Sequence, residues 1–390
     1  MANTPASYTG FLPALGWNSW NTFTWDINET LIKEVADLFV SEGYKDAGYE
    51  YIVIDDCWSL RQRDENGRLV ADPEKFPSGM KALADYIHAK GLKFGMYSCA
   101  GTHTCAGYPA SFEHEFEDAK QFAEWGVDYL KYDYCYKPRN VSGELLYKRM
   151  SLALKNCGRD ILFSACNWGE DNVHDWIRES GAHSYRSTGD IQNNWESIKR
   201  LALSQMDKKA FTGSFCHNDM DMLVVGMYDG SNDSWIGQSE NVCTDTQYKT
   251  HFALWCMMGS PLMIGCDIRK ATPFTKELLQ NKHLLAINQD PEARGAYRIA
   301  VEPQWFGKDE AFILVKTLQN GDLAIGLFNL SDNAKNLSLQ LWDIGLSQRS
   351  GYGLSMMDCF TGENLGTFRE NFFRSVPAHD CVVVRASLMR

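Results

Sequence analysis

Side chains capable of acid–base and covalent chemistry stand at the ends of short apolar runs in the first three quarters of the chain. They comprise acids, cations and aromatic rings: Trp17, Trp20, Asp55, Asp56, Tyr97, Lys131, Asp133, Asn167, Trp168, Arg186, Asp190, Asp219 and Asp221. Two carboxylates can protonate a glycosidic oxygen and attack the anomeric carbon, while flat rings pack against the apolar face of a sugar. This combination predicts carbohydrate chemistry.

Other hydrolytic chemistries are poorly supported. The set has no two histidines at metal-ligand spacing, and the chain has no G-x-S-x-G motif for acyl transfer. The nearest candidate for a metal site is formed by Cys99, His103, Cys105 and Cys135, whose spacing fits no common zinc pattern. We therefore expect no metal and no cofactor. The twelve cysteines lie singly, and those beside the run ends are expected to be packing residues: Cys57, Cys166, Cys216 and Cys266.

The run around Asp133 places several functional groups on one face of a strand. Because side chains alternate along a strand, Lys131, Asp133 and Cys135 share a face. An ammonium beside Asp133 favours the ionised carboxylate that a nucleophile requires. Purely structural roles are the alternative for these charges: a Lys131–Asp133 ion pair, an Arg186–Asp190 salt bridge with Asp190 capping a helix, and loop capping by Asp55 and Asp56.

The elements that must position these groups are eight apolar runs, each followed by a helical pattern. The runs are Ala14–Trp20, Tyr49–Asp56, Leu92–Cys99, Tyr129–Cys135, Ile161–Asn167, Ser184–Asp190, Phe215–Val224 and Pro261–Asp267. Eight such units over about 280 residues predict an α/β fold, a (β/α)8 TIM barrel with its active site at the C-terminal ends of the strands. A doubly wound sheet is less favoured because no glycine-rich phosphate loop follows any run.

Short β runs separated by turns follow Asp290-Pro291: Ala311–Lys316, Leu323–Phe328, Asn336–Leu341 and Cys381–Ala386. They predict a small antiparallel β-sandwich domain. We therefore place the catalytic barrel at residues 1–295 and the sandwich at residues 296–390. The stretch 226–245 is expected to form a loop or lid after the seventh strand.

Composition narrows the classes of partner. With 38 basic and 50 acidic residues the net charge is −12, which argues against nucleic acid. No run of eighteen apolar residues is present, so we expect no membrane span. The first ten residues lack the basic start and apolar stretch of a signal peptide. This predicts a cytoplasmic protein, or a secreted one if the chain is a trimmed mature form. Whether the protein forms a homo-oligomer is left open by the sequence.

Eight motifs, in order from about residue 12 to residue 291, carry a family resemblance. They are LGWNSWNTF, YIVIDDCWS, FPSGMKALADYIHAKGLKFGMYS, TCAGYPASFEHE, WGVDYLKYDYC, CNWG, R-x-x-x-D-I and PLMIGCDIR. Together they resemble the α-galactosidases (melibiases) of glycoside hydrolase family 27. The final PAHDCVVVRA is similar to the end of that family's β domain, with less specificity.

The resemblance implies a retaining exo-hydrolase that releases terminal α-linked galactose. It implies that Asp133 is the nucleophile, that Asp190 is the general acid/base, and that Cys105 and Cys135 form a disulfide at the pocket. The implied sugar contacts are Asp55 and Asp56 to O4 and O6, Lys131 to O3 and O4, Arg186 and Asp221 near O2, and Trp20, Tyr97 and Trp168 as walls. A general acid must start protonated, so the pKa of Asp190 is expected to lie above that of Asp133.

Some positions depart from the family pattern. Asn167 stands before Trp168 where many relatives have Glu, and we expect its amide to bind the sugar 2-hydroxyl. Tyr185 replaces a usual Trp, and His217 begins a stretch that differs from W-N-D-P-D-M-L. These changes are expected near the 2-position and the leaving group. The alternatives are therefore a β-L-arabinopyranosidase, an α-N-acetylgalactosaminidase or, from another class, a galactose-binding barrel without catalysis.

Overall fold

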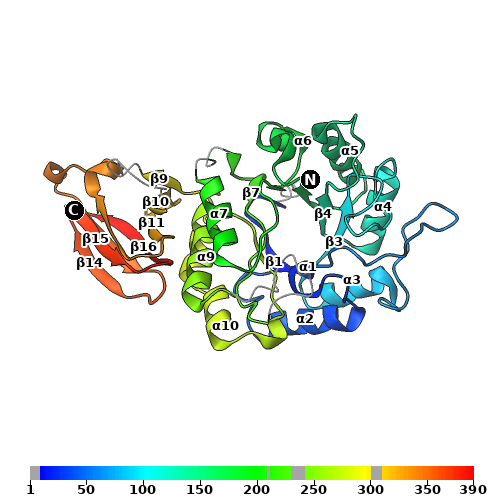
Figure 1. The fold of residues 1–390 in the computed structure, drawn as a ribbon, viewed down its shortest axis with the longest axis horizontal. Helices are drawn as coiled ribbons and strands as arrows, with labels where there is room; N and C mark the ends of the chain where they lie inside the picture. Colours follow the sequence, from blue (N-terminus) through cyan, green and yellow to red (C-terminus); the bar gives the residue numbers. More distant parts are fainter. Residues whose placement is uncertain (1–8, 207, 209–210, 230–241, 300–309) are drawn as a thin grey trace, which may run out of the picture.

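The first part of the chain folds into a curled parallel sheet surrounded by helices (Figure 1). The structure, a computed structural model, describes residues 9–206, 208, 211–229, 242–299 and 310–390. The strands of the barrel are β1 (Leu15–Asn18), β2 (Tyr51–Val53), β3 (Lys93–Cys99), β4 (Tyr129–Asp133), β5 (Leu162–Cys166), β6 (Ser184–Arg186), β7 (His217–Asp219) and β8 (Leu262–Ile264). Each lies inside one of the eight predicted runs, so the predicted barrel is confirmed.

The sheet closes on itself. Its strands are paired in the order β7-β6-β5-β4-β3-β2-β1-β8, all in parallel. Leu223, just beyond β7, forms a parallel bridge to Ile264 of β8 and donates its N–H to the carbonyl of Met263 at 2.8 Å. This contact joins the two ends of the strand order, so the C-terminal ends of all eight strands surround one mouth.

Helices cover the outside of the barrel, except for α1 (Trp20–Phe23), whose Trp20 and Asn21 line the mouth. The other helices of the described residues are α2 (Glu29–Ser41), α3 (Gly79–Ala89), α4 (Glu115–Trp125), α5 (Gly143–Lys155), α6 (Ile177–Ser180), α7 (Trp195–Gln205), α9 (Asp245–Met258), α10 (Pro273–Leu279) and α11 (Lys282–Asn288). Several begin at a side-chain cap, as at α2, where Asn28 Oδ1 accepts from the N–H of Leu31 at 2.9 Å. The described residues contain no helix long and apolar enough to cross a membrane.

The inside of the barrel changes from apolar to charged along β4. Tyr51, Val53 and Tyr129 form part of an apolar cluster within the barrel. Alternation then puts Lys131 and Asp133 on the same inward face as Tyr129. The apolar layer closes the bottom of the barrel, and the charged side chains lie above it, toward the mouth.

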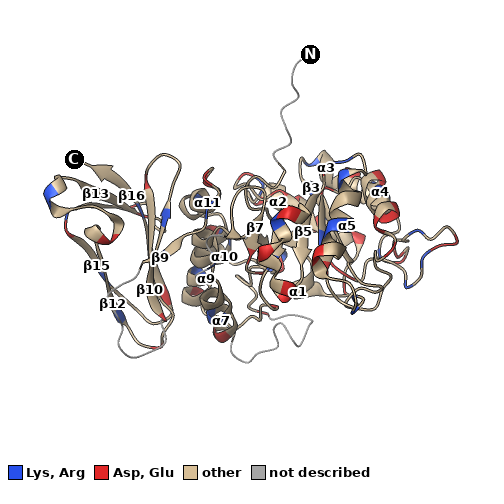
Figure 2. Cartoon of the chain, turned by 90° about the horizontal axis from the view of Figure 1, so that it is seen from above, with Lys and Arg blue, Asp and Glu red and all other residues tan. Residues whose placement is uncertain are grey.

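The C-terminal part folds into two antiparallel sheets beside the barrel (Figure 2). The strands are β9 (Tyr297–Ile299), β10 (Ala311–Thr317), β11 (Leu323–Asn329), β12 (Lys335–Gln340), β13 (Gly353–Asp358), β14 (Asn364–Phe368), β15 (Asn371–Val376) and β16 (Asp380–Met389). The predicted sandwich is confirmed, with β9, β13, β14 and β15 in addition to the four expected runs. The boundary at residues 295/296 stays a prediction, and the expected lid at 226–245 falls largely on residues 230–241, outside the described part of the chain.

Helix α9 joins the two parts of the molecule. Almost every side chain from Tyr248 to Met258 is buried, because one face packs on the barrel and the other on β10, β11 and β16. A capping box of Thr244 and Gln247 begins the helix, and Gly259 ends it in the left-handed conformation. The barrel and the sandwich therefore share apolar packing along this helix.

A buried lysine lies at the same junction. Lys316 of β10 is 1% exposed, and its ammonium donates to the carbonyl of Ile287 in α11. Burial lowers the pKa of Lys316 to about 8, although the nearby Asp290 opposes this change. The folded protein therefore releases this proton at a lower pH than the unfolded chain, whose lysines titrate near 10.4.

Replacing Lys316 should change how stability depends on pH. In the wild type, the free energy of unfolding should gain roughly 3 kcal/mol from this group as pH rises from about 8 to 10.4, since the unfolded state then binds more protons. Lys316→Met should be the more stable protein near pH 7, with an advantage that shrinks at high pH. Urea unfolding at several pH values measures this. The exposed Lys335→Met is the control, and parallel pH curves for wild type and Lys316→Met would contradict the prediction.

Candidate active site

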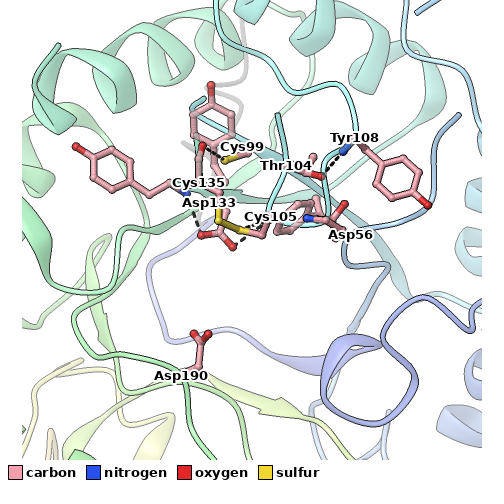
Figure 3. Close-up of a disulfide and its surroundings, with 12 residues drawn as sticks. Asp56, Cys99, Thr104, Cys105, Tyr108, Asp133, Cys135 and Asp190 are labelled. Carbon is pink, nitrogen blue, oxygen red and sulfur yellow. Dashed lines mark hydrogen bonds between the residues drawn. A yellow bond between two sulfur atoms is a disulfide. The ribbon is translucent and has the colours of Figure 1, made fainter. Parts of the chain in front are cut away.

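A cavity of about 180 Å³ lies at the mouth of the barrel and gathers most of the predicted residues. It is lined by Trp20, Asn21, Asp55, Asp56, Tyr97, Cys105, Lys131, Asp133, Cys135, Trp168, Arg186, Asp190, Ile191, Asp221 and Met222. Wider hollows lie elsewhere on the surface, but this one combines acids from the ends of strands β2, β4, β6 and β7. Figure 3 shows Asp190 across the open centre of the mouth from Asp133.

Asp55 and Asp56 follow β2 and are both 2% exposed. Asp55 Oδ2 accepts hydrogen bonds from Asn18 Nδ2 at 2.7 Å and from Lys131 Nζ at 2.8 Å. Asp56 Oδ2 accepts from the backbone N–H of Ala106 at 2.9 Å. Burial raises the pKa of Asp56, although its hydrogen bonds oppose this. The two carboxylates are thus fixed by separate partners and face the same cavity.

Asp133, at the end of β4, has no cation bound directly to it among the residues that the structure describes. Tyr97 OH donates to its Oδ2 at 3.1 Å, and the N–H of Tyr134 donates to its Oδ1 at 2.9 Å. Burial raises the pKa of Asp133 to about 6, while the charge of Lys131 opposes this rise. The alternative of a structural Lys131–Asp133 ion pair is therefore wrong, because the ammonium bonds to Asp55 and acts on Asp133 through space, where it favours the ionised carboxylate.

Arg186 connects the two acids on the opposite side. Its Nη1 donates to Asp221 Oδ1 and its Nη2 to Asp190 Oδ1, both at 2.6 Å. Burial raises the pKa of Asp190, but the Arg186 guanidinium outweighs burial and holds that pKa below its usual value. The expectation that the pKa of Asp190 exceeds that of Asp133 is therefore wrong for the unliganded site. Asp190 is also not a helix cap, since Asn194 caps α7.

A disulfide forms part of the cavity wall. Cys105, in the loop after β3, bonds to Cys135, just beyond β4 (Figure 3). The implied pairing is therefore present, and the other ten cysteines are free. Cys57, Cys166, Cys216 and Cys266 are all buried, as expected of packing residues.

Several strand ends continue into strained backbone. Cys57, Trp168 and Asp221 have φ angles of 69°, 60° and 83°, in the left-handed region that side chains rarely adopt. Each follows a barrel strand and turns the chain at the mouth. Such strain persists where surrounding contacts enforce it, as for Asp221, whose Oδ2 accepts from the N–H of Ile191 at 2.7 Å.

The residues that depart from the family pattern do not line the cavity. Asn167 is fully buried and donates its amide to the carbonyl of Glu170 at 2.8 Å, while its Oδ1 has no hydrogen-bond partner among the described residues. Its expected contact with the sugar 2-hydroxyl stays a prediction. Tyr185 OH donates to the carbonyl of Phe211 at 2.8 Å. His217 Nε2 lies 3.2 Å from the carbonyl of Gly10, at the opposite end of the barrel. The expectation that Tyr185 and His217 lie near the 2-position and the leaving group is therefore wrong.

Other residues of the site were missed from the sequence. Asn21, Ile191 and Met222 line the cavity, and the buried Asn21 Nδ2 has no hydrogen-bond partner among the described residues. The motifs WNSWN and R-x-x-x-D-I contained Asn21 and Ile191, but neither has a charge that would have singled it out. Asp219, by contrast, was expected at the mouth and instead lies behind it, accepting from the N–H of Asp221 at 2.8 Å.

Two family models match the chain. The model described as alpha galactosidase A covers residues 12–290, and the alpha galactosidase C-terminal beta sandwich domain covers residues 308–386. The chain belongs to the α-galactosidase family. The resemblance to glycoside hydrolase family 27 is thereby confirmed, and the protein is a glycosidase.

Curated relatives and solved structures agree with this family. Alpha-galactosidase A of Cellvibrio japonicus is 39% identical over 96% of this chain and 92% of that protein, and the alpha-galactosidase of Coffea arabica is 39% identical over 96% and 93%. The structure of alpha-galactosidase I from Mortierella vinacea has a TM-score of 0.86 at 33% identity and covers 99% of this chain and 98% of that one. A β-L-arabinopyranosidase from Geobacillus stearothermophilus, 23% identical with a TM-score of 0.84 over 97% and 96%, shows the common fold alone.

Proposed function

We propose that the protein releases terminal α-linked galactose from galactosides by double displacement. The observation that carries this proposal is the small cavity in which Asp133 and Asp190 face each other across its open centre (Figure 3). A cavity of about 180 Å³ has room for one sugar ring, which supports removal of a terminal residue. Relatives named α-galactosidases, at 38–43% identity, support galactose over the alternatives.

Two carboxylates divide the chemistry. Asp133 attacks the anomeric carbon while Asp190 protonates the leaving oxygen, so the glycosidic bond breaks and a β-linked galactosyl ester forms on Asp133. Asp190 then removes a proton from water, which attacks the same carbon from the vacated side. Asp133 leaves as a carboxylate, and the product is α-galactose. Each inversion reverses the other, so the configuration is retained.

The proton on Asp190 must arrive with the substrate. In the unliganded site, Arg186 holds this carboxylate ionised through a 2.6 Å ion pair. A bound galactoside excludes water from Asp190, and its 2-hydroxyl competes for the guanidinium. Both changes disfavour the charged carboxylate and raise the pKa of Asp190 toward that of a general acid.

The remaining polar groups define the sugar. Asp55 and Asp56 accept hydrogen bonds from O4 and O6, Lys131 contacts O3 and O4, and Arg186 with Asp221 contacts O2. The carboxylate of Asp56 is fixed by the N–H groups of Ala106 and Cys57, so an arabinopyranoside, which lacks the hydroxymethyl group, would leave its acceptor unpaired. Trp20, Tyr97 and Trp168 supply walls for the ring.

Comparative rates test the sugar. The nitrophenyl α-galactoside should react at least about a hundredfold faster than the α-N-acetylgalactosaminide, because a 2-acetamide has no room beside Arg186 and Asp221, and a loss of about 2.7 kcal/mol gives that factor. The β-L-arabinopyranoside should also be the poorer substrate. Values of kcat/KM for the three compounds, measured side by side, decide the matter. A value for either of the other two compounds equal to that for the galactoside would contradict the assignment.

Azide should separate the roles of the two acids. Asp133→Ala should lose a factor of about 10⁴ or more in turnover, and azide entering the vacated face should yield β-galactosyl azide. Asp190→Ala should keep more activity on nitrophenyl α-galactoside, whose leaving group needs little protonation. In the Asp190→Ala variant, azide replaces water in the second step and gives α-galactosyl azide. Product NMR reads both outcomes. The assigned roles of the two acids would be overturned if Asp133→Ala gave the α-azide and Asp190→Ala the β-azide. They would also be overturned if the wild type first released β-galactose.

The alkaline limb of the pH profile should report Asp133. The value of kcat/KM depends on the free enzyme, in which the pKa of Asp133 is about 6 and Arg186 holds that of Asp190 lower, and catalysis needs the pair to carry one proton. The value of kcat/KM should therefore fall as pH rises above about 6, because the pair then loses that proton. Lys131→Met removes a nearby cation and should move this limb to higher pH. In Asp190→Asn, measured with an activated substrate, Asp133 alone must ionise, so activity should instead fall as pH drops below the pKa of Asp133. Circular dichroism over the same pH range controls for unfolding. Profiles that coincide in all three proteins would contradict the assignment.

A further inference from the structure

Three potential metal-ligating atoms meet at the disulfide. The Sγ atoms of Cys105 and Cys135 and a carboxylate oxygen of Asp133 all lie within 4.8 Å of one another (Figure 3). Among the described residues, no other group of three such side chains comes this close. In the oxidised protein the two sulfurs are bonded to each other and are not available as thiolate ligands.

We propose that reduction of the Cys105–Cys135 disulfide opens a binding site for a thiophilic divalent cation such as Zn²⁺, and that the bound cation blocks Asp133. A dithiol reductant supplies two electrons and two protons, the S–S bond breaks, and the dithiol closes to its own disulfide. Zn²⁺ then displaces the two thiol protons to water. Two thiolates, the Asp133 carboxylate and one water would complete a tetrahedral site.

The backbone around both cysteines is held independently of the disulfide. The N–H of Ala106, next to Cys105, donates to Asp56 Oδ2 at 2.9 Å. Cys99 Sγ donates to the carbonyl of Cys135 at 3.1 Å. Because these hydrogen bonds do not involve the S–S bond, reduction leaves the two thiols close together. The Cα atoms, 5.1 Å apart, need little movement for both thiolates to bind one ion.

Tyr97 connects the sulfur and carboxylate ligands. Its hydroxyl lies 3.4 Å from Cys105 Sγ and donates to Asp133 Oδ2 at 3.1 Å. Groups that hydrogen-bond to metal ligands fix their orientation and strengthen binding. Tyr97 is 2% exposed and therefore has little freedom to move. The third ligand is thus already directed toward the sulfurs by a rigid neighbour.

The charge of the cavity favours a cation. Five carboxylates and two cationic side chains line it, an excess of three negative charges before any thiol ionises. Of the two cations, Lys131 is paired with Asp55 and Arg186 with Asp190 and Asp221. Cys105 is exposed, so both a dithiol and the metal ion can reach the sulfur. Attraction and access therefore both favour binding once the sulfurs are free.

Zinc content and turnover test the proposal on the whole chain. Denatured, unreduced protein should show ten free thiols, and protein reduced with a dithiol twelve. After the reductant is removed, reduced protein should bind one more Zn²⁺ per chain than oxidised protein. The zinc-bound reduced protein should hydrolyse nitrophenyl α-galactoside at least about tenfold more slowly than the oxidised protein, and a chelator should restore the rate. Equal zinc content and equal sensitivity in both redox states would overturn the proposal.

Variants separate the metal site from the effect of losing the disulfide. The double variant Cys105→Ala/Cys135→Ala lacks both the bridge and the sulfur ligands, so its activity should respond equally to zinc with and without reductant. Cys157→Ser, which removes a half-buried free cysteine outside the cavity, should behave as wild type in both states. Redox-dependent zinc inhibition in the double variant would assign the effect to other cysteines and overturn the site.

A readout without turnover isolates the third ligand. Cd²⁺ bound to thiolates absorbs in the ultraviolet, so titration of the reduced chain measures affinity even in an inactive variant. Asp133→Asn should weaken Cd²⁺ binding by about tenfold or more while the thiolate band remains. An unchanged affinity would exclude Asp133 as a ligand. Because this titration is independent of hydrolysis, it stands even if the proposed substrate is wrong.

Discussion

The crowding of five carboxylates, four of them buried, beside only two cations is the constraint on which the mouth of the barrel depends. Like charges packed this closely persist only where each is paired or hydrogen-bonded. Lys131 neutralises Asp55, and Arg186 is shared between Asp190 and Asp221. Asp133 receives only hydrogen bonds from Tyr97 and Tyr134. Asp133, which is proposed to attack the sugar, is therefore held by hydrogen bonds alone among the described residues, as is Asp56, and burial raises the pKa of both.

The barrel makes this arrangement by register. Strands β3 and β4 pair Tyr97 with Lys131 and Cys99 with Asp133, so the hydrogen-bond donor to Asp133 and the neighbouring cation lie side by side. Below them, Tyr51, Val53 and Tyr129 seal the interior with apolar packing. Above this apolar floor Asp55, Asp56, Asp133 and Asp221 are buried, and a medium of low dielectric strengthens the electrostatic interactions among them. The fold thus sets both the positions of the acids and the medium in which they act.

Local pattern was sufficient to predict the barrel and most of the site, because parallel strands carry their C-terminal residues to one mouth wherever they occur. The local pattern could not predict which charged side chains form ion pairs with one another. Lys131 stands two residues from Asp133 in the sequence yet bonds to Asp55, 76 residues away, and the order of the two pKa values changes with such choices. Strand β15 was overlooked because Phe373 is exposed while Phe372 and Val376 are buried, so the run FFRSV is only half apolar toward the core.

The departures from the family pattern have a structural explanation. Tyr185 and His217 stand inside barrel strands but bond to backbone carbonyls away from the cavity. Burial lowers the pKa of His217 to about 4, so this residue is neutral near pH 7 and acts as a packed hydrogen-bonding group. Within the same stretch, Asp221 and Met222 keep the family residues and line the cavity. Tyr185 and His217 therefore lie away from the cavity, while Asp221 and Met222, which match the family motif, line it. A change of residue type inside a family motif is consistent with an unchanged substrate when its side chain faces away from the site.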